Sequence, residues 1–170
     1  MASKIIQGPF TLTWGANTLE DVEDVKVDFS QDETDYKTVQ FQTRTITGAM
    51  KASISITLLK GDIAALGAIF PQYLVVNGET MSTGETVTDA EGAIDIKAAA
   101  CDAEETFNDL EIEACDDPGL VLRLVNANAK LDSVEIDGKI LKQVVKFNGQ
   151  PEDTEAILQF FNRGSLGEVS

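Results

Sequence analysis

The sequence contains no histidine, so it lacks the side chain that most often acts as a base or a metal ligand near neutral pH. It also lacks a phosphate-binding loop, because Gly61 and Gly67 border a predicted helix without the lysine and hydroxyl residue that such loops need. The 29 Asp and Glu residues offer many carboxylate pairs, but none has a spacing specific to glycoside hydrolysis. We therefore expect no catalytic residue, no enzyme activity and no cofactor.

Calcium is a metal for which the sequence offers candidate ligands. The acidic segments Asp89–Gly92 and Asp102–Glu105 contain the hard oxygen atoms that Ca²⁺ prefers. Neither segment has acidic residues at alternate positions, with a glycine at the sixth and a glutamate at the twelfth. We expect solvated acidic loops there and no metal site.

Long apolar runs are also missing. No stretch of about 18 apolar residues is present, so the sequence predicts no membrane-spanning helix. The first nine residues include one lysine and no apolar segment, which does not fit a secretory signal. The only cysteines, Cys101 and Cys115, are expected to be ordinary thiols of a protein folded in a cytoplasm, and a disulfide between them is the alternative.

Basic residues are scarce: 13 Lys and Arg stand against 29 Asp and Glu, which gives a net charge of −16 and a pI near 4.2. This balance argues against tight binding to DNA, RNA or an anionic membrane. The acids gather in residues 79–117, with thirteen, and residues 20–35, with eight. The plain interpretation is solubility; the alternative is a negatively charged channel wall that repels a passing polyanion over a Debye length of ~8 Å.

Alternating apolar and polar residues dominate what is present. The stretch from Tyr36 to Phe70 contains two strand patterns, Thr38–Ile46 and Ala52–Leu58, which are separated by a predicted break at Gly48. In the first pattern Val39 and Phe41 are expected on the packed face. A helix pattern follows, with Asp62 as its cap and Pro71 after its end. The strand that contains Val25, Val27 and Phe29 leads into the acidic segment Ser30–Asp35, which we interpret as the tip of a long hairpin.

The rest of the chain continues this pattern, and Leu120–Val125 and Leu131–Ile136 are predicted as separate strands. Asp137–Gly138 predicts a second hairpin, and Glu155–Phe161 fits either a short helix or a strand. About eight strands and one helix predict a mainly β fold, a sandwich or barrel-like domain with one flanking α-helix. We expect one domain over residues 1–170, with a mobile N-terminal arm at about 1–9 and a loose C-terminal tail at about 162–170.

Several segments together resemble a known family. They are the Val22–Ile46 hairpin, the strand in Gly48–Leu58, the helix start Gly61–Leu66 and the segment Val144–Asp153. In their order they resemble the major tail tube protein of long-tailed, non-contractile bacteriophages. The resemblance covers most of the chain and is a pattern of elements rather than an invariant motif. Tube proteins of contractile tails and of type VI secretion share this fold.

The resemblance implies a structural virion protein that self-assembles into hexameric rings. These rings stack into a tail tube, lined by a continuous β-barrel, that conducts DNA to the host. It further implies tape-measure, tail terminator and distal tail proteins as partners, double-stranded DNA that passes without tight binding, and assembly in the host bacterial cytoplasm before incorporation in the virion.

Two sets of residues receive roles from this resemblance. The hairpin tip would reach a neighbouring ring through Ser30, Gln31, Asp32, Glu33, Thr34, Asp35 and Tyr36. The hairpin faces opposite the packed ones would line the lumen through Asp24, Lys26, Asp28, Gln40, Gln42 and Arg44. Lys26 and Arg44 fit a lumen only beside neutralising acids, and subunit contacts are their alternative.

Two other classes of protein stay open at this point. An acidic β-sandwich module could bind a small ligand or a carbohydrate through its loops. Another virion β-sandwich, such as a head decoration or tail terminator protein, would share the fold without building a tube.

Overall fold

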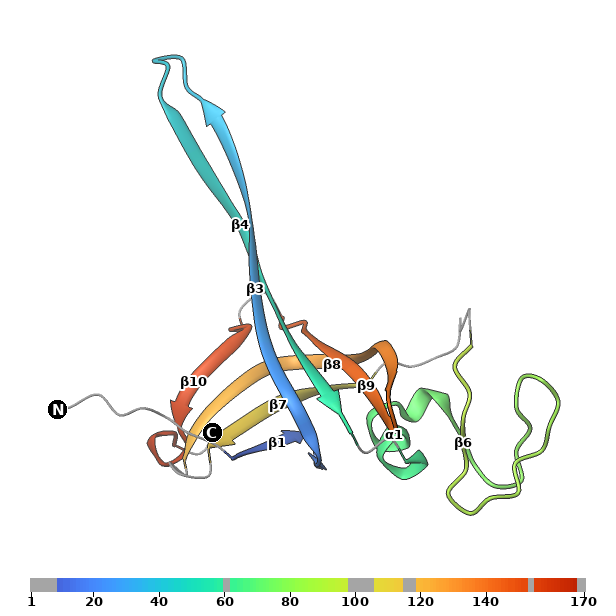
Figure 1. Ribbon diagram of the computed structural model, residues 1–170. Helices are drawn as coiled ribbons and strands as arrows, with labels where there is room; N and C mark the ends of the chain where they lie inside the picture. Colours follow the sequence, from blue (N-terminus) through green and yellow to red (C-terminus); the bar gives the residue numbers. More distant parts are fainter. Residues whose placement is uncertain (1–8, 60–61, 98–105, 115–118, 153–154, 168–170) are drawn as a thin grey trace.

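The computed structural model describes residues 9–59, 62–97, 106–114, 119–152 and 155–167. Within them the protein is mainly β, with one α-helix beside the sheet (Figure 1). Cys101, Cys115 and nearly all of the expected N-terminal arm lie outside the described residues. The elements are β1 (Phe10–Trp14), β2 (Asn17–Leu19), β3 (Val22–Lys37), β4 (Thr43–Leu58), α1 (Ile63–Ile69), the 3₁₀ turn η1 (Pro71–Tyr73), β5 (Leu74–Val75), β6 (Ala93–Ile94), β7 (Phe107–Ala114), β8 (Leu120–Asp137), β9 (Ile140–Gly149), β10 (Leu158–Asn162) and the 3₁₀ turn η2 (Arg163–Ser165).

One antiparallel sheet of eight strands joins segments that are far apart in the sequence. Its order is β2–β1–β7–β8–β9–β4–β3, and β10 pairs with the first part of β8. The long strand β8 has β7 along one edge, while its other edge pairs first with β10 and then with β9. A second, two-stranded sheet consists of β5 and β6.

The large sheet curls around its core. Trp14 on β1 and Phe147 on β9 are three positions apart in the strand order, yet their ring centroids lie 5.6 Å apart. The indole N–H of Trp14 donates to the Ala127 carbonyl on β8 at 3.1 Å, which satisfies its one polar group inside the core. The alternation of buried and outward side chains predicted for β4 is confirmed. Every second residue from Ala52 to Leu58 belongs to the hydrophobic core: Ala52, Ile54, Ile56 and Leu58.

The helix covers an open end of this curl. Asp62 Oδ1 accepts from Ala65 N at 2.8 Å, so the predicted cap is confirmed. Ile69 and the following Phe70 are buried in the core cluster, and Pro71 starts η1 directly after the helix ends. The one-sided apolar pattern of α1 therefore fixes it against the sheet.

Two predictions about the second half of the chain are wrong. The sequence predicted separate strands around Val125 and Ser133, but β8 is continuous, because residues 127–131 between them pair with residues 145–149 of β9. The φ of 50° at Asn126 and the bulge after Leu131 are irregularities within this one strand. The predicted loose tail is partly ordered: Asn162 ends β10, and Arg163 begins η2 and contacts Glu111 on β7 at 2.8 Å.

Candidate assembly surface

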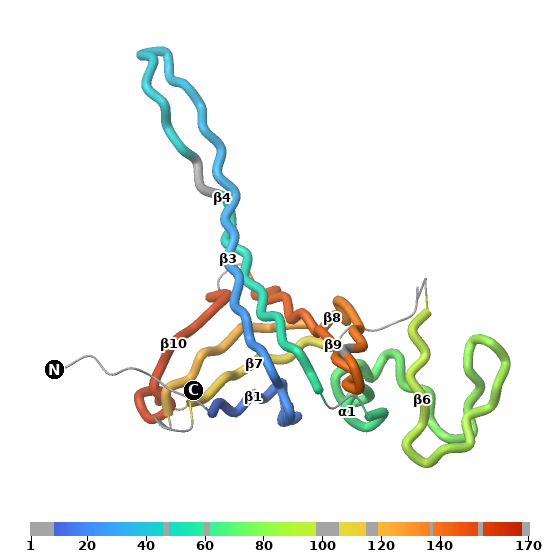
Figure 2. The backbone as a smooth tube through the Cα atoms, in the orientation of Figure 1, coloured from blue at the N-terminus to red at the C-terminus, as the bar shows by residue number. Residues whose placement is uncertain are grey.

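Strands β3 and β4 extend far beyond the sheet and form a two-stranded arm (Figures 1 and 2). The pairing of β4 with β9 starts only at Ser53, so within the described residues the hairpin has no third strand between residues 30 and 51. We call residues 30–51 the arm. Its described side chains are exposed, apart from a half-buried Thr38. Since two-stranded hairpins are at best marginally stable in water, an arm of this length indicates a surface that meets a partner.

Polar contacts between its two strands hold the arm in register. Thr45 Oγ1 donates to Asp35 Oδ1 at 2.6 Å, and the Lys51 ammonium lies 3.7 Å from an Asp32 carboxylate oxygen. A bulge places Gly48 and the next residue opposite Asp32, and a Cβ on Gly48 would lie only 3.1 Å from the Asp32 carbonyl oxygen. The strand therefore runs through Gly48, and the break predicted there is wrong.

The turn of the arm lies at residues 38–42, which we call the arm tip. Thr38 N donates to Gln42 O at 2.8 Å, and Phe41 N donates to Thr38 O at 2.9 Å. The prediction that the tip of the hairpin lies at residues 30–36 is therefore wrong. These residues belong to the extended strand β3: Ser30, Gln31, Asp32, Glu33, Thr34, Asp35 and Tyr36. The acidic run resembles a loop because both faces of the arm meet solvent, so its strands need no apolar side.

Two large apolar side chains stand out at the arm tip. Val39 is 91% exposed and Phe41 is 89% exposed, and Phe41 has a φ of 61°, a backbone region that bulky residues rarely adopt. Sequence reasoning missed this pair because it placed both residues on the packed face of a strand. The signal against that reading was the polar sequence on both sides of them, from Ser30 to Tyr36 and from Gln42 to Thr45.

The structure brings together only half of the residues predicted for the lumen. Lys26 pairs with Ser55 and Asp28 with Ser53 in the ladder, and Asp24 lies in the same strand, so these residues share the outer face of the sheet. The other half does not join them: Gln40 and Gln42 lie in the arm tip, and Arg44 pairs with Tyr36 near it. These three residues therefore do not share a face with Asp24, Lys26 and Asp28, because the turn places them at the far end of the arm.

This outer face has a mixed charge. One row across four strands carries Lys26, Ser55, Lys146 and Lys130. The Lys26 ammonium lies 3.6 Å from an Asp28 carboxylate oxygen, and Asp24 is the second acid nearby on β3. Lys142, on the same face of β9, lies 3.0 Å from a Glu23 carboxylate oxygen and pairs with Glu135 on β8, so acids and lysines are about balanced on this face. The excess of negative charge lies elsewhere in the sequence, mainly in residues 79–117, whereas the arm is balanced, with Asp32, Glu33 and Asp35 against Lys37, Arg44 and Lys51.

A charged cluster that the sequence did not reveal lies on the outer face of β7, β8 and β10. Glu111 Oε1 accepts from Arg123 Nη2 at 2.9 Å, and its other oxygen accepts from Arg163 at 2.8 Å. The guanidinium of Arg123 also lies 4.5 Å from the ring centre of Phe161 on β10. Burial raises the pKa of Glu111, but the two arginines outweigh this effect and the net pKa lies below its ordinary value. The cluster fastens β10 and η2 to the sheet.

Two findings limit the other kinds of site. Among the residues that the structure describes, no three His, Cys, Asp or Glu side chains are grouped so as to hold a metal ion. In the same part of the chain, no helix has the length and apolar character needed to cross a membrane.

No protein-family model matches the chain, and no curated protein matches it. Its fold does match solved structures. A chain from the sheath–tube complex of PVC, an extracellular contractile injection system, in the extended state gives a TM-score of 0.53 and 15% identity over 91% of this chain and 92% of that chain. A chain from the PVC sheath/tube terminator gives 0.50 and 15%, over 93% and 98%. A chain from the baseplate of the anti-feeding prophage gives 0.50 and 7%, over 96% and 99%. At these identities the likeness concerns the fold alone, and the protein has a phage-tail-type fold.

Proposed function

We propose that the protein is a structural subunit of a phage-type tail tube and that it catalyses no reaction. The observation that carries this proposal is the arm, whose two exposed strands reach beyond the sheet and end in two exposed apolar side chains. A monomer gains nothing from such an extension, because no described side chain of the arm joins the core. The whole-length likeness of fold to a chain from a sheath–tube complex supports the same role.

Six copies form a ring in this proposal. Strand β3 is the last strand in the order of the sheet, so its outer edge offers backbone groups to a neighbouring copy. One structure with a similar fold comes from a baseplate that was averaged with six-fold symmetry, which supports this number. Rings then stack through their arms into a tube, and the outer face of β3, β4, β9 and β8 is our candidate for its inner wall.

The finer parts of the proposal follow the sequence resemblance. They are one domain over residues 1–170, a non-contractile tail, assembly in the bacterial cytoplasm into a virion, and tape-measure, tail terminator and distal tail proteins as partners. Double-stranded DNA passes without tight binding, for which the net charge of −16 is the support. Two of the chains with a similar fold come from a contractile injection system, so the presence or absence of a sheath on purified tails tests the non-contractile part.

A tail terminator is the second candidate, because one similar chain belongs to a sheath/tube terminator. The two roles differ in how far assembly proceeds. A tube subunit stacks ring on ring, whereas a terminator closes a tube as a single ring.

Electron microscopy of the purified full-length protein at increasing concentration tests the proposal. A tube subunit gives six-fold rings and hollow rods, a terminator gives rings without rods, and a lone monomer at every concentration overturns both roles. A matched variant lacks residues 32–49 and connects Gln31 to Met50 by a two-residue Asn-Gly turn. These two residues are paired across the arm, so a short turn can join them. We expect this variant to keep its core, as judged by circular dichroism, and to lose the rods. Rods of normal length would show that the arm is not used in assembly.

A further inference from the structure

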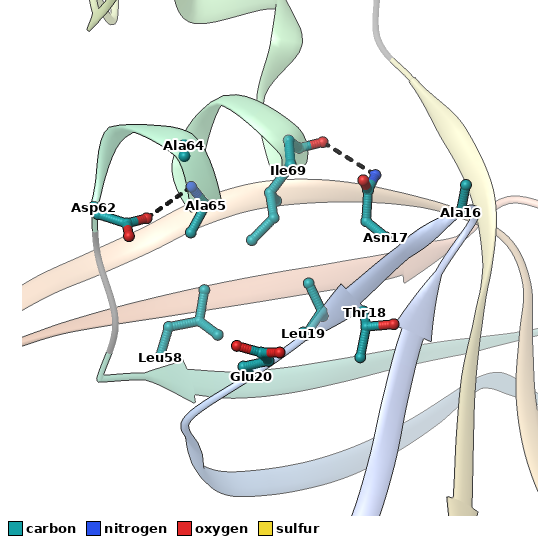
Figure 3. A pocket seen from close by; sticks show the side chains of 11 residues that line it. Ala16, Asn17, Thr18, Leu19, Glu20, Leu58, Asp62, Ala64, Ala65 and Ile69 are labelled. Atoms are coloured by element: carbon teal, nitrogen blue, oxygen red, sulfur yellow. Dashed lines mark hydrogen bonds between the residues drawn. The ribbon is translucent and has the colours of Figure 1, made fainter. Parts of the chain in front are cut away.

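A pocket of about 330 Å³ lies between α1 and the β1–β2 hairpin. Its floor is apolar: Leu19, Leu58 and Ile69 are buried and point into it (Figure 3). The Asn17 side-chain amide donates to the Ala68 carbonyl at 3.5 Å and links the hairpin to the helix at one side. This volume lies at the lower end of the roughly 300–1,000 Å³ of small-ligand pockets, a size that suits one or two side chains.

Acidic side chains and small side chains form the rim of this pocket. Glu20 and Asp62 are exposed and place two carboxylates beside the opening, and Asp62 is held in position by its bond to Ala65 N. Alanines on α1 supply the rest of that side, so no large side chain blocks the entrance. An apolar group between cations would be the complementary occupant.

The arm tip has this complementary chemistry. Its apolar side chains, Val39 and Phe41, are almost fully exposed, and exposed Lys37 and Arg44 flank the tip on the two strands. A hydrogen bond from Arg44 to the Gln42 side chain at 3.5 Å keeps this guanidinium beside the tip. The tip therefore presents an apolar knob between two positive charges, and the pocket presents an apolar floor between two negative charges.

The tip and the pocket lie at opposite ends of the same hairpin. Leu58, on the pocket floor, pairs with Val22 at the start of β3, whereas the tip follows the end of β3 (Figure 1). The 16 residues of β3 span roughly 50 Å at ~3.4 Å per residue. The tip of one chain therefore cannot enter its own pocket. A contact between the tip of one copy and the pocket of the next is head-to-tail, and such contacts repeat along an axis when the rotation between copies does not close a ring.

We propose that the arm tip of one copy inserts Phe41 and Val39 into the α1–β2 pocket of a second copy in the adjacent ring. This inference rests on the proposed function, because it names the partner of the arm within the stacked tube. It also limits the spacing of the rings: one tip-to-pocket step is roughly 50 Å, and any tilt of the arm shortens the axial repeat below that value.

Two full-length variants test this contact from its two sides. Phe41→Ser removes the knob, and Ala68→Trp fills the pocket from an exposed position on α1. Each variant should form single rings but raise the concentration needed for rods by at least about tenfold, because each ring loses the burial of a large apolar group at several contacts. Phe160→Ser is the control, since Phe160 is 70% exposed on β10, away from the tip and the pocket, and its loss should leave rods unchanged.

Mixing separately formed rings of the two variants gives a sharper result. Rings with Ala68→Trp keep intact tips, and rings with Phe41→Ser keep intact pockets, so the mixture should form ring pairs that grow no further. A photo-reactive phenylalanine analogue at position 41 should cross-link, in rods, to the segments 16–20 or 58–69 of another copy. If wild-type protein forms rods but Phe41→Ser forms them equally well, or if cross-links fall elsewhere, this contact is wrong while the tube function stands. If wild-type protein forms no rods, the tube function fails and this contact fails with it.

Discussion

Trp14 and Phe147 meet edge to face, with an angle of 62° between their rings, although two strands separate β1 from β9 in the sheet. The contact closes the curl of the sheet, and the bond from the Trp14 indole to the Ala127 carbonyl fixes its geometry. We predict that Trp14→Ala lowers the free energy of unfolding by about 3–5 kcal/mol, the usual cost of removing a buried aromatic side chain. Urea unfolding followed by far-ultraviolet circular dichroism measures this change. Phe10→Ala, half-exposed on the same strand, is the control and should cost about 1 kcal/mol or less; similar losses for both variants would contradict the role of Trp14.

Where the sheet has a core on one side, the sequence alone predicted the fold well. In β4 the buried face of Ile54 and Ile56 alternates with Ser53 and Ser55, and this period of two identifies both the strand and its packed side. The helix was equally clear, because a cap at Asp62 and a proline after its end define its limits. In these segments local preference and burial agree, so the pattern carries the information.

The arm could not be predicted in the same way. Its strands have solvent on both faces, so the acidic run from Asp32 to Asp35 carries no period and resembles a loop, while the tip residues Val39 and Phe41 resemble a buried strand. The hydrogen bonds between β3 and β4 and within the turn determine where the strands pair and where the chain reverses. Which residues of the arm share a face can be assigned only when the pairing register of β3 and β4 is known.

The helix cap at Asp62 gives a prediction about one wall of the pocket. Asp62→Ala removes the acceptor for the Ala65 amide and should cost about 1 kcal/mol of stability. Amide hydrogen exchange should quicken at the start of α1, and Asp62→Asn, which can still cap the helix, is the matched control. Equal loss of protection in both variants would mean that the charge, rather than the cap, holds the helix.

The cluster around Glu111 predicts a pH dependence of stability. The pKa of Glu111 is lower in the folded chain than its ordinary value of 4.5, so the unfolded chain binds the proton more tightly. The stabilisation is therefore present above pH 4.5 and is lost as the pH falls through the lowered pKa of the folded state. Glu111→Gln should lower the free energy of unfolding by about 1–2 kcal/mol at pH 7, because the acceptor for the two arginines is then uncharged.

The pH profile separates this role from a purely structural one. Unfolding curves at a series of pH values should show that the free energy of unfolding falls less below pH 4.5 in Glu111→Gln than in the wild-type protein. Hydrogen exchange should quicken first in β10, which Arg163 and Arg123 connect to the sheet through this carboxylate. Glu33→Gln, an exposed acid on the arm, is the control and should leave the profile unchanged. Profiles that coincide for Glu111→Gln and the wild-type protein would contradict the assignment.

The candidate lumen wall gives a prediction about DNA. Asp24 and Asp28 are two acids on β3 beside the lysine row on the outer face of the sheet, so the double variant Asp24→Lys, Asp28→Lys makes this face strongly basic. If the face lines the tube, rods of this variant should retain DNA at low salt and release it steeply as salt rises, because each added phosphate contact displaces a counterion. Asp32→Lys with Glu33→Lys makes the same change in net charge on the arm. DNA retained equally by both double variants would show an effect of net charge alone, and the inner wall would then have to be sought on another face.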